Sequence, residues 1–515
     1  MLASLRSAAV VGVEALPVIV EVDVSFGLPI FTMVGLPDAS VRESRDRVRS
    51  AIRNSGFQFP AHRITVNLAP ADVRKAGASY DLPIALGILA ASGVLVGREV
   101  ADVVLLGELS LDGSIQPIRG ALPVAAAAWR EGKAAILLPR ANVAEARVVA
   151  GLTVLPVDSL LEAVDALNQP IAEAAKALGA ATAKPKLTDL SSLLAGPVES
   201  APDFAEVAGQ SMAKRALEVA AAGAHNVLLI GAPGGGKTMM ARRLPGILPP
   251  LAFDEALECT SVHSVAGTLP AGTALIAERP FRAPHHSISE PAMVGGGKIP
   301  KPGEICLAHN GVLFLDEFGE FERCVLESLR QPLEEGRITV TRLARTASFP
   351  ARFMLVAAMN PCPCGFRGDQ RRLCRCTQPQ LQRYVGKISG PLLDRIDLIV
   401  EVPAIGAYSS QESHEEPSKA IRDRVAVARR RQCDRFGGGH GLLNSQLMGS
   451  VLREHCALDR PGSKLLQAAI RRFCLSARGT DRVLRVSRTI ADLAGATNIG
   501  GEHLAEALQY RLIFT

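Results

Sequence analysis

The chain of 515 residues has few aromatic side chains, with one Trp, four Tyr and an aromatic content of 4%. Proteins that grip single-stranded nucleic acid through stacked bases rely on aromatic side chains, so the composition disfavours a binder of that kind. No run reaches the ~18 uncharged apolar residues that a membrane helix requires. The nearest run, residues 82–97, contains one Pro and three Gly. We expect a core helix followed by a turn there, and no membrane association.

Net charge is also small, since 57 basic and 51 acidic residues give +6, which permits contact with a polyanion without requiring it. A hydrophobic content of 48% excludes disorder as the main state. Glu14 and Glu21 follow the first apolar run closely, which argues against a signal peptide and predicts a cytoplasmic protein. Four of the ten Cys lie within residues 362–376, and such clustering in the cytoplasm indicates metal binding more than disulfides.

The length predicts about three domains, or two large ones. Residues 1–167 alternate Val/Ile-rich runs with helical patterns, including strands at 18–26 and 63–70 and an amphipathic helix at 39–56 whose charges indicate a solvated face. Residues 168–202 are rich in Ala, Ser, Pro and Lys and indicate a linker with at most one weak helix. Residues 203–405 form a second region of strands and helices, and residues 406–515 have helical periodicity.

The strongest motif follows an apolar strand at 227–230 and precedes a helical pattern. It is the glycine-rich sequence G-x-x-x-x-G-K-T of phosphate-binding loops. Its main-chain N–H groups, with the helix N-terminus, surround the phosphates, its lysine adds positive charge, and its threonine hydroxyl ligates Mg²⁺. The expected nucleotide-binding residues are Gly231, Ala232, Pro233, Gly234, Gly235, Gly236, Lys237 and Thr238.

A second apolar strand, 311–315, ends in Asp316 and Glu317. Asp316 is expected to hold the Mg²⁺ together with Thr238, and Glu317 to polarise the attacking water. A carboxylate pair at a strand end is weak evidence alone, but downstream of a phosphate-binding loop it indicates an NTP hydrolase.

The 79 positions between Lys237 and Asp316 exceed what a minimal phosphate-binding core needs. The interval includes a stretch dense in Gly, Pro, His and basic residues, which predicts an exposed loop or hairpin that reaches a ligand. Its candidate residues are Arg282, His285, His286, Lys298 and Lys301. The alternative is a plain surface insertion in which the His pair packs locally.

The four clustered cysteines form two C-x-C pairs, Cys362 with Cys364 and Cys374 with Cys376. Four thiolates can hold a tetrahedral Zn²⁺, so we expect a structural zinc site. Reduced structural thiols or a redox pair are the alternatives. Arginines in or beside the loop could couple it to DNA; they are Arg367, Arg371, Arg372 and Arg375.

Several further motifs, among them RPFRAPHHSIS, LAHNGVLFLDE, AAMNPCPCG, SGPLLDRIDL and SARGTDRVLRVSRTIADLAG, resemble the magnesium-chelatase-like AAA+ ATPases. Within them the chain resembles the ComM (YifB) family over nearly its whole length. The resemblance implies an α/β fold. A P-loop AAA+ module with a helical lid would follow an α+β domain similar to the Lon protease domain, of the ribosomal S5 domain 2-like type. It also implies ATP and Mg²⁺ as cofactors.

The resemblance also implies roles for three residues. Asn360 matches sensor 1 beside the attacking water, Arg395 the arginine finger that reaches a neighbouring subunit, and Arg485 sensor 2 in the lid. Guanidinium groups suit the charge of a transferring phosphoryl group. Arg482 competes with Arg485 for the sensor 2 role, and a surface salt bridge is the alternative for each arginine. A finger acting in trans implies a ring, most simply a homo-hexamer.

The N-terminal region departs from its resemblance. Ser79 lies at the position of the nucleophilic serine of Lon-type proteases, which require a lysine base. The corresponding later segment contains no Lys between Asp112 and Trp129, and Lys133 falls too late. We therefore predict a non-proteolytic domain that acts as a scaffold or a DNA-binding ring.

The leading hypothesis is an ATP-driven, hexameric DNA translocase or helicase that promotes branch migration during natural transformation. Lys and Arg loops would grip single-stranded or branched DNA through its phosphates. The Arg-rich lid fits either that grip or nucleotide sensing; its residues are Arg471, Arg472, Arg478, Arg482, Arg485 and Arg488. One alternative is a chelatase-type motor that remodels a protein partner. An ATP-dependent protease, disfavoured by the missing lysine, is another.

Overall fold

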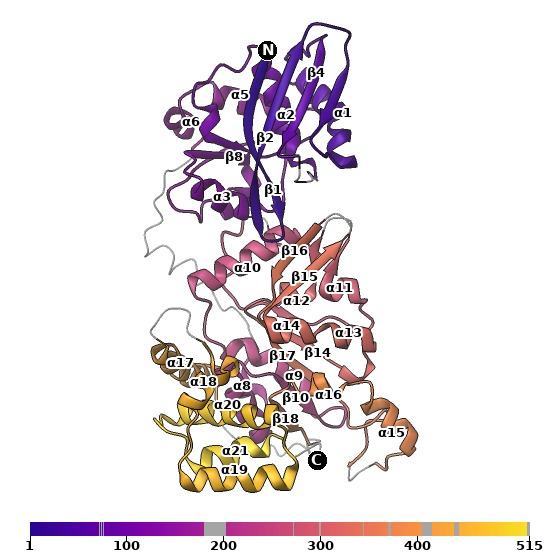
Figure 1. Cartoon of the computed structure of the whole chain (residues 1–515), viewed down its shortest axis with the longest axis vertical. Coiled ribbons are helices and arrows are strands. Elements are labelled where there is room, and N and C mark those ends of the chain that lie inside the picture. Colours follow the sequence, from indigo (N-terminus) through magenta and orange to yellow (C-terminus); the bar gives the residue numbers. More distant parts are fainter. Residues whose placement is uncertain are drawn as a thin grey trace.

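The computed structural model describes residues 1–71, 73, 75, 77–179, 202–270, 272–297, 300–342, 345–368, 372–403, 415–436 and 442–511. The molecule is elongated (Figure 1). An N-terminal domain occupies one end, a second sheet with its helices lies in the middle, and a group of C-terminal helices occupies the other end. The structure therefore has the α/β class that the sequence predicts.

The N-terminal domain is built on a seven-stranded mixed sheet in the order β3-β4-β2-β1-β5-β8-β9. Its long hairpin pairs β1 with β2 from Leu2↔Asp23 to Val11↔Glu14, and the turn contains Gly12 at φ +66°. The predicted strands at 18–26 and 63–70 are confirmed as parts of β2 and β4. The strand bounds are β1 Leu2–Val11, β2 Glu14–Ser25, β3 Phe31–Val34, β4 Arg63–Ala69, β5 Val103–Leu105, β8 Ala135–Pro139 and β9 Thr153–Val157, with a separate pair β6 Glu108–Leu109 and β7 Ile115–Gln116.

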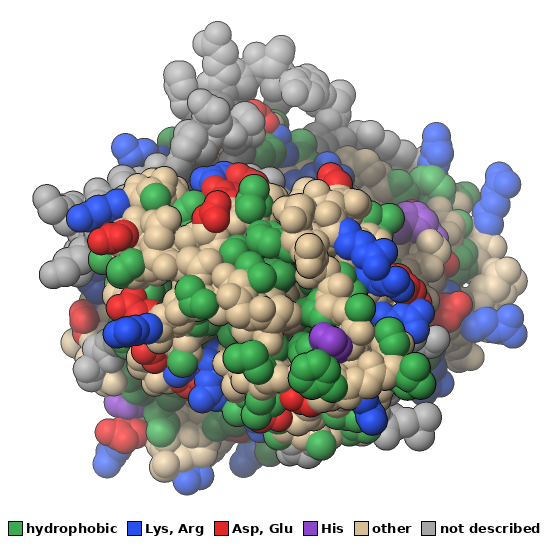
Figure 2. Space-filling view, turned by 90° about the horizontal axis from the view of Figure 1, so that it is seen from above, with side chains coloured by type: hydrophobic (Ala, Val, Ile, Leu, Met, Phe, Trp, Pro, Cys, Tyr) green, Lys and Arg blue, Asp and Glu red, His purple; other side chains and the backbone are tan. Residues whose placement is uncertain are grey.

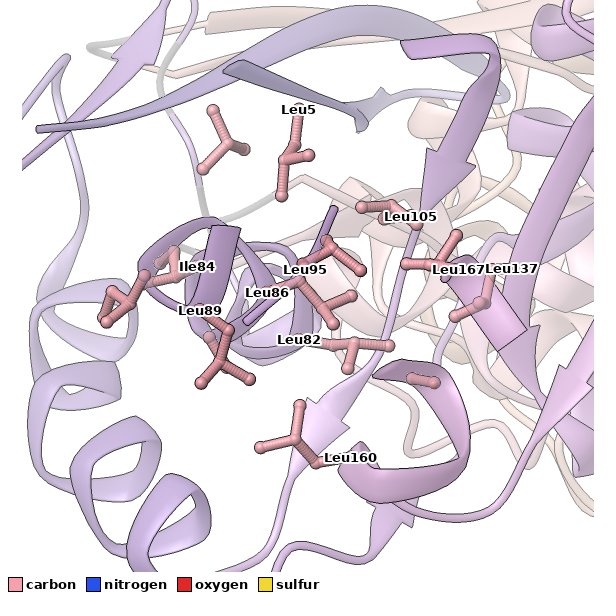
Figure 3. Packing of buried hydrophobic residues seen from close by; sticks show 14 of the residues in the cluster. Leu5, Leu82, Ile84, Leu86, Leu89, Leu95, Leu105, Leu137, Leu160 and Leu167 are labelled. Carbon is pink, nitrogen blue, oxygen red and sulfur yellow. The ribbon is translucent and has the colours of Figure 1, made fainter. Parts of the chain in front are cut away.

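Helix α2 (Asp81–Ala91) is the centre of this domain's core. Nearly every residue of α2 is buried, as expected of a helix that is apolar all round. Leucines from the sheet and from neighbouring helices surround it (Figure 3). The expected core helix and turn are thus confirmed, with Gly93 at φ +80° after the helix end. The other helices are α1 Ala39–Asn54, α3 Ala121–Arg130, α4 Val143–Ala146, α5 Leu160–Leu167 and α6 Ile171–Ala177.

The sequence pattern predicts that the charged side chains of α1 face solvent, but one of them does not. Arg47 reaches α2, where its Nε lies 2.7 Å from Oδ2 and its Nη2 3.1 Å from Oδ1 of the fully buried Asp81. The hydroxyl of Ser44 also donates to Asp81. A buried carboxylate requires such partners, so this pair joins the surface helix to the core helix.

The boundary at residue 167 needs correction. Helix α6 lies inside the stretch assigned to a linker, yet Ala174 and Ala175 belong to the N-terminal core. Helix α6 contacts α5 and β9 of the N-terminal domain, so that domain extends to at least Ala177. Residues 180–201 lie outside the described residues.

The middle of the molecule contains a five-stranded parallel sheet in the order β11-β14-β17-β10-β18. Side chains of β10 alternate between two cores, with Val227 and Leu229 on one face and Leu228 and Ile230 on the other. A parallel sheet covered on both faces gives such continuous apolar strands. The bounds are β10 Val227–Ile230, β11 Phe281–Arg282, β14 Val312–Leu315, β17 Met354–Met359 and β18 Leu398–Glu401.

Helices and short hairpins cover this sheet. Antiparallel pairs join β12 (Gly295–Gly296) to β13 (Lys301–Pro302) and β15 (Arg337–Arg342) to β16 (Arg345–Pro350). The helices are α8 Ser211–Gly223, α9 Lys237–Arg243, α10 Phe253–Ala266, α11 Glu290–Val294, α12 Glu304–Leu307, α13 Arg323–Ser328, α14 Arg330–Glu335, α15 Gln378–Val385 and α16 Gly390–Leu393.

The N-terminal domain contacts this region through α10 and β16. Ser264 of α10 donates from its hydroxyl to Glu145 Oε2 over 2.5 Å and accepts from the main-chain N–H of Gly120 over 3.1 Å. All three residues are buried. The β1–β2 turn reaches β16, since a Cβ on Gly12 would lie 2.7 Å from the carbonyl oxygen of Ser348. Specific polar contacts therefore join the two parts.

The C-terminal part is helical, as predicted. Its central helix α20 (Ala477–Ala494) packs against α8, α17 and α21, and thereby joins the core on one face of the parallel sheet. The other bounds are α17 Ser418–Arg435, α18 Gly449–His455, α19 Arg460–Phe473 and α21 Gly501–Gln509. Throughout the described residues, no helix combines the length and the apolar character that crossing a membrane would demand.

Candidate nucleotide site, arginine cleft and cysteine cluster

The glycine-rich loop joins strand β10, which lies between β17 and β18, to helix α9. Gly234 and Gly236 have φ angles of +80° and +85°, a region that favours glycine. Gly231 has no room for a side chain, because a Cβ there would lie 2.0 Å from the carbonyl oxygen of Val402. The main-chain N–H groups of this loop and of the first turn of α9 can therefore bind phosphate oxygens.

Lys237 lies folded against this loop. Its Nζ donates to the carbonyl oxygens of Gly231 and Ala232 over 2.7 and 2.9 Å, and to Asn360 Oδ1 over 3.2 Å. Burial lowers the pKa of Lys237, while the charge of Asp316 opposes that shift. Asn360 directly follows β17, so the predicted sensor residue and the loop lysine are in contact.

Asp316 and Glu317 directly follow β14 and lie beside the phosphate loop. Asp316 Oδ2 accepts from the Thr238 hydroxyl over 2.6 Å, and its Oδ1 accepts from the N–H of Glu317 over 2.9 Å. The structure therefore brings together the two residues expected to hold Mg²⁺, whose preferred ligands are oxygen atoms. Glu317 has a left-handed backbone with φ +53°, and its carboxylate is half exposed.

A histidine from the insertion contacts Glu317. Nδ1 of His286 lies 3.0 Å from Glu317 Oε2, and its ring lies 4.1 Å from that of His285. In the sequence, His286 is only one candidate residue of the insertion, and nothing in its spacing pointed to Glu317, 31 positions later. The contact places His286 beside the predicted catalytic carboxylate, while the two His rings also pack locally on each other.

The basic residues of the insertion have different surroundings. Arg282 forms a two-point ion pair with Glu304, at 2.6 and 2.7 Å, so its guanidinium is engaged within the chain. Lys301 lies exposed in β13. Lys298 lies outside the described residues.

A cleft of about 920 Å³ runs along the amino ends of the parallel strands, which is the opposite edge from the phosphate loop. Arg395, Arg478, Arg482 and Arg485 all line it. The predicted finger and both sensor 2 candidates are thus brought together with one another. The structure does not bring them to Lys237 of the same chain.

The neighbours of the cleft arginines provide hydrogen-bond acceptors for only some of the guanidinium N–H groups. Arg395 pairs with Glu334 and donates to the carbonyl oxygen of Pro391 over 2.7 Å. Arg482 lies 3.7 Å from each of two aspartates, Asp394 and Asp397. Among the described residues, the buried Arg395 Nε and Arg482 Nη1 have no hydrogen-bond acceptor. Arginine N–H groups without acceptors at a cleft suit an incoming anion.

Arg485 and Arg482 differ in their surroundings. Arg485 donates from Nε to the carbonyl oxygen of Leu447 over 2.7 Å, which anchors α20 to the segment just before α18. Arg482 is more deeply buried, and burial lowers its pKa to about 10, so it stays charged at neutral pH. Both line the same cleft, and both remain candidates for the same role.

The four clustered cysteines converge. The Sγ atom of Cys362 lies 3.3 Å from that of Cys364 and 3.6 Å from that of Cys374, and Cys364 and Cys374 are also 3.6 Å apart. All four ligand atoms, including that of Cys376, lie within 4.8 Å of one another. Tetrahedral zinc with Zn–S bonds of ~2.3 Å places its sulfur atoms ~3.8 Å apart, so the cluster fits zinc.

Main-chain N–H groups and burial act in opposite directions on the cluster. The N–H groups of Phe366 and Arg375 lower the pKa of Cys364, whereas burial raises the pKa of Cys362. Arg372 stacks on the Phe366 ring at 5.1 Å. Arg371 lies outside the described residues.

The strand order, with the phosphate-loop strand between β17 and β18, defines a P-loop ATPase module of the AAA+ class. Family models agree: "Magnesium chelatase, subunit ChlI" matches residues 203–410, "Subunit ChlI of Mg-chelatase" residues 20–142, and "Magnesium chelatase, subunit ChlI C-terminal" residues 415–511. The chain belongs to the ComM/YifB family of magnesium-chelatase-like AAA+ ATPases.

The relatives support this assignment. "Competence protein ComM" of Haemophilus influenzae is 45% identical, covering 99% of this chain and 97% of the relative. "Uncharacterized protein YifB" of Salmonella typhimurium is 44% identical over the same shares. A "Magnesium-chelatase 38 kDa subunit" of Rhodobacter capsulatus is 28% identical, covering 60% of this chain and 87% of the relative.

Proposed function

We propose that this protein is an ATP-dependent DNA translocase that works as a homo-hexamer and promotes branch migration in homologous recombination during natural transformation. The observation that carries the proposal is the complete phosphate site in a chain similar to a competence protein. A cytoplasmic location belongs to the proposal, since recombination acts on DNA inside the cell.

Each subunit's own nucleotide site contains the groups that ATP hydrolysis needs apart from the arginines of the neighbouring subunit. ATP would lie on the loop with its phosphates at the start of α9, and Lys237 would exchange its carbonyl partners for phosphate oxygens. Thr238 and Asp316 would hold Mg²⁺ between them. Glu317 would accept the proton of the attacking water, with Asn360 orienting that water.

The arginine cleft completes the site in trans. Arg395 lies at the amino edge of the sheet and the phosphate loop at the carboxyl edge, so Arg395 faces away from the nucleotide of its own subunit. A head-to-tail ring places that cleft against the next subunit's nucleotide. Arg395, with Arg482 or Arg485, would then stabilise the transition-state charge there.

A basic surface on the C-terminal helices supports the DNA contact. Helix α19 contains no acidic residue, and its exposed cations are Arg460, Lys464, Arg471 and Arg472. Within the described residues, none of the four forms an ion pair with an acidic group. Cations without such partners can neutralise DNA phosphates with no dependence on sequence.

The N-terminal domain serves this motor as a scaffold. Lys75, the nearest lysine before Ser79, is buried and donates to the carbonyl oxygen of Pro70. The later segment between Asp112 and Trp129 contains no Lys, so no lysine is assigned as base for that serine. Seen from this end of the molecule, hydrophobic side chains lie over the middle of the face, and Lys, Arg, Asp and Glu side chains lie mostly towards its margin (Figure 2). We therefore assign no peptidase activity to the domain.

A labelled four-way junction tests the proposal. With ATP, the wild-type protein should convert the junction to its branch-migrated products, and Lys237→Ala should bind the junction without converting it. Junction binding without ATP-dependent conversion would contradict the translocase. The alternative is a chelatase-type motor acting on a protein partner, which the 28% identical chelatase subunit suggests. It would lead if no DNA bound across a range of salt concentrations.

A further inference from the structure

We propose that the four-cysteine cluster is a zinc site that holds the phosphate loop and Asn360 in their nucleotide-binding arrangement, so that zinc binding and ATP binding strengthen each other. The cluster is Cys362, Cys364, Cys374 and Cys376. The inference rests on the proposed ATP site, and it adds a regulating metal to that site.

The first link is a direct contact between the cluster and the phosphate loop. Gly365 follows Cys364 and has φ +83°. A Cβ there would lie 2.8 and 2.9 Å from the Cδ and Cγ atoms of Pro233. The main chain of the cluster therefore lies flat against the third residue of the phosphate loop, and only glycine allows the approach.

The second link runs through Asn360. It precedes the buried Cys362 by two residues, and its Oδ1 accepts from Lys237 Nζ over 3.2 Å. A tight turn follows, in which the N–H of Gly365 donates to the carbonyl oxygen of Cys362 over 2.9 Å. One short segment thus holds both the loop contact and the lysine contact.

The physical consequence follows from the four sulfur atoms. Without metal, thiolates at 3.3 to 3.6 Å repel one another, and neutral thiols give only weak hydrogen bonds. With zinc, each thiol releases its proton and the four sulfur atoms are fixed around one ion. A metal that selects the arrangement which binds ATP must, by reciprocity, bind more tightly when ATP is present.

A matched pair of glycine variants can separate the effect of the contact with Pro233 from the effect of backbone strain. Gly365 and Gly368 have nearly equal φ angles, +83° and +81°, but a Cβ at Gly368 meets no atom within 4 Å. Gly365→Ala and Gly368→Ala should therefore strain the backbone alike, and only Gly365→Ala should press on Pro233. Circular dichroism and metal content should be the same for the two variants if both fold.

The first experiment measures zinc content by elemental analysis of protein purified without added metal, and affinity for a fluorescent ATP analogue in binding titrations. We expect one zinc per chain in the wild type and in both variants. Gly365→Ala should weaken the analogue about tenfold or more, within the range typical of coupled sites, and Gly368→Ala should bind as the wild type does. Equal affinities of the two variants would overturn the contact as the coupling route.

The second experiment needs no variant. Zinc is removed from the wild-type protein with a chelator, and the analogue is titrated before removal, after removal, and after zinc is returned. We expect affinity to fall on removal and to recover on return. Protein that neither contains nor takes up zinc would overturn the metal site. Zinc-loaded protein whose affinity does not change on removal would overturn the coupling alone. Zinc-loaded protein that binds no nucleotide would overturn the proposed function as well.

Discussion

Mixing two inactive variants tests whether Arg395 acts on the neighbouring subunit. Strand β10 has four residues, and at ~3.3 Å per residue the two edges of the sheet lie about 13 Å apart. Arg395 precedes β18 at one edge, and the phosphate loop follows β10 at the other. That separation is too long for Arg395 to reach the γ-phosphate of its own subunit, so the arginine must act in trans or not at all.

The ATPase rate expected of the mixture follows from how the two variants pair as neighbours in the ring. Arg395→Ala alone should lower ATP turnover by about 10³-fold, as loss of an arginine finger does, and Lys237→Ala alone should abolish it. In an equal mixture, a working interface needs Lys237 from one subunit and Arg395 from the next, so about one quarter of the interfaces in a head-to-tail ring regain both. A coupled ATPase assay on the mixture should reach about a quarter of the wild-type rate.

The control mixes Lys237→Ala with Glu317→Gln. Both residues belong to the same subunit's site, so no interface regains a complete set and the mixture should stay inactive. If the mixture with Arg395→Ala also stays inactive although the variants assemble together, the trans assignment of Arg395 is refuted.

Three other changes should have separable effects. Glu317→Gln should keep the wild-type affinity for an ATP analogue but lower turnover by about 10²-fold or more, the size of lost general-base catalysis; weak analogue binding would contradict its assignment. Asp81→Asn should destabilise the N-terminal domain by about 3 kcal/mol, because it strips Arg47 of its buried partner, whereas Asp46→Asn at an exposed pair should cost less than ~0.5 kcal/mol; equal shifts in urea unfolding would count against the buried pair. The hydrogen bond from His309 lowers the pKa of Glu258 from 4.5 to about 2, so the stabilisation from ionised Glu258 is present above pH 4.5 and is lost as the pH falls towards 2. Because that carboxylate is half exposed, Glu258→Gln should cost only about 1 kcal/mol at pH 7, and the difference from wild type should shrink below pH 4.5 in thermal melts.

The parts of the fold predicted from sequence are those set by local pattern. The phosphate loop follows from glycine spacing after an apolar strand, and Thr238 and Asp316 met as expected because both follow parallel strands of one sheet. The C-terminal helices follow from their periodicity. Helix α6 lies in a segment whose Ala and Lys give little amphipathic contrast, so the sequence predicts a linker with at most one weak helix there, although Ala174 and Ala175 belong to the core.

The contacts that could not be predicted from the sequence join residues far apart in the chain. His286 reaches Glu317, Arg47 reaches Asp81, and Gly365 lies against Pro233, each by way of tertiary packing. The cleft shared by Arg395 and Arg482 also depends on where the C-terminal helices dock against the sheet. Spacing in a single sequence does not encode such docking.

The rate of ATP hydrolysis with and without branched DNA shows whether DNA drives this ATPase. It should be measured on wild-type protein and on Lys237→Ala over a series of salt concentrations. We expect that branched or single-stranded DNA raises the wild-type rate, that the increase fades as salt weakens the phosphate contacts, and that Lys237→Ala shows no turnover. A wild-type rate that DNA leaves unchanged at every salt concentration would refute the proposed DNA translocase.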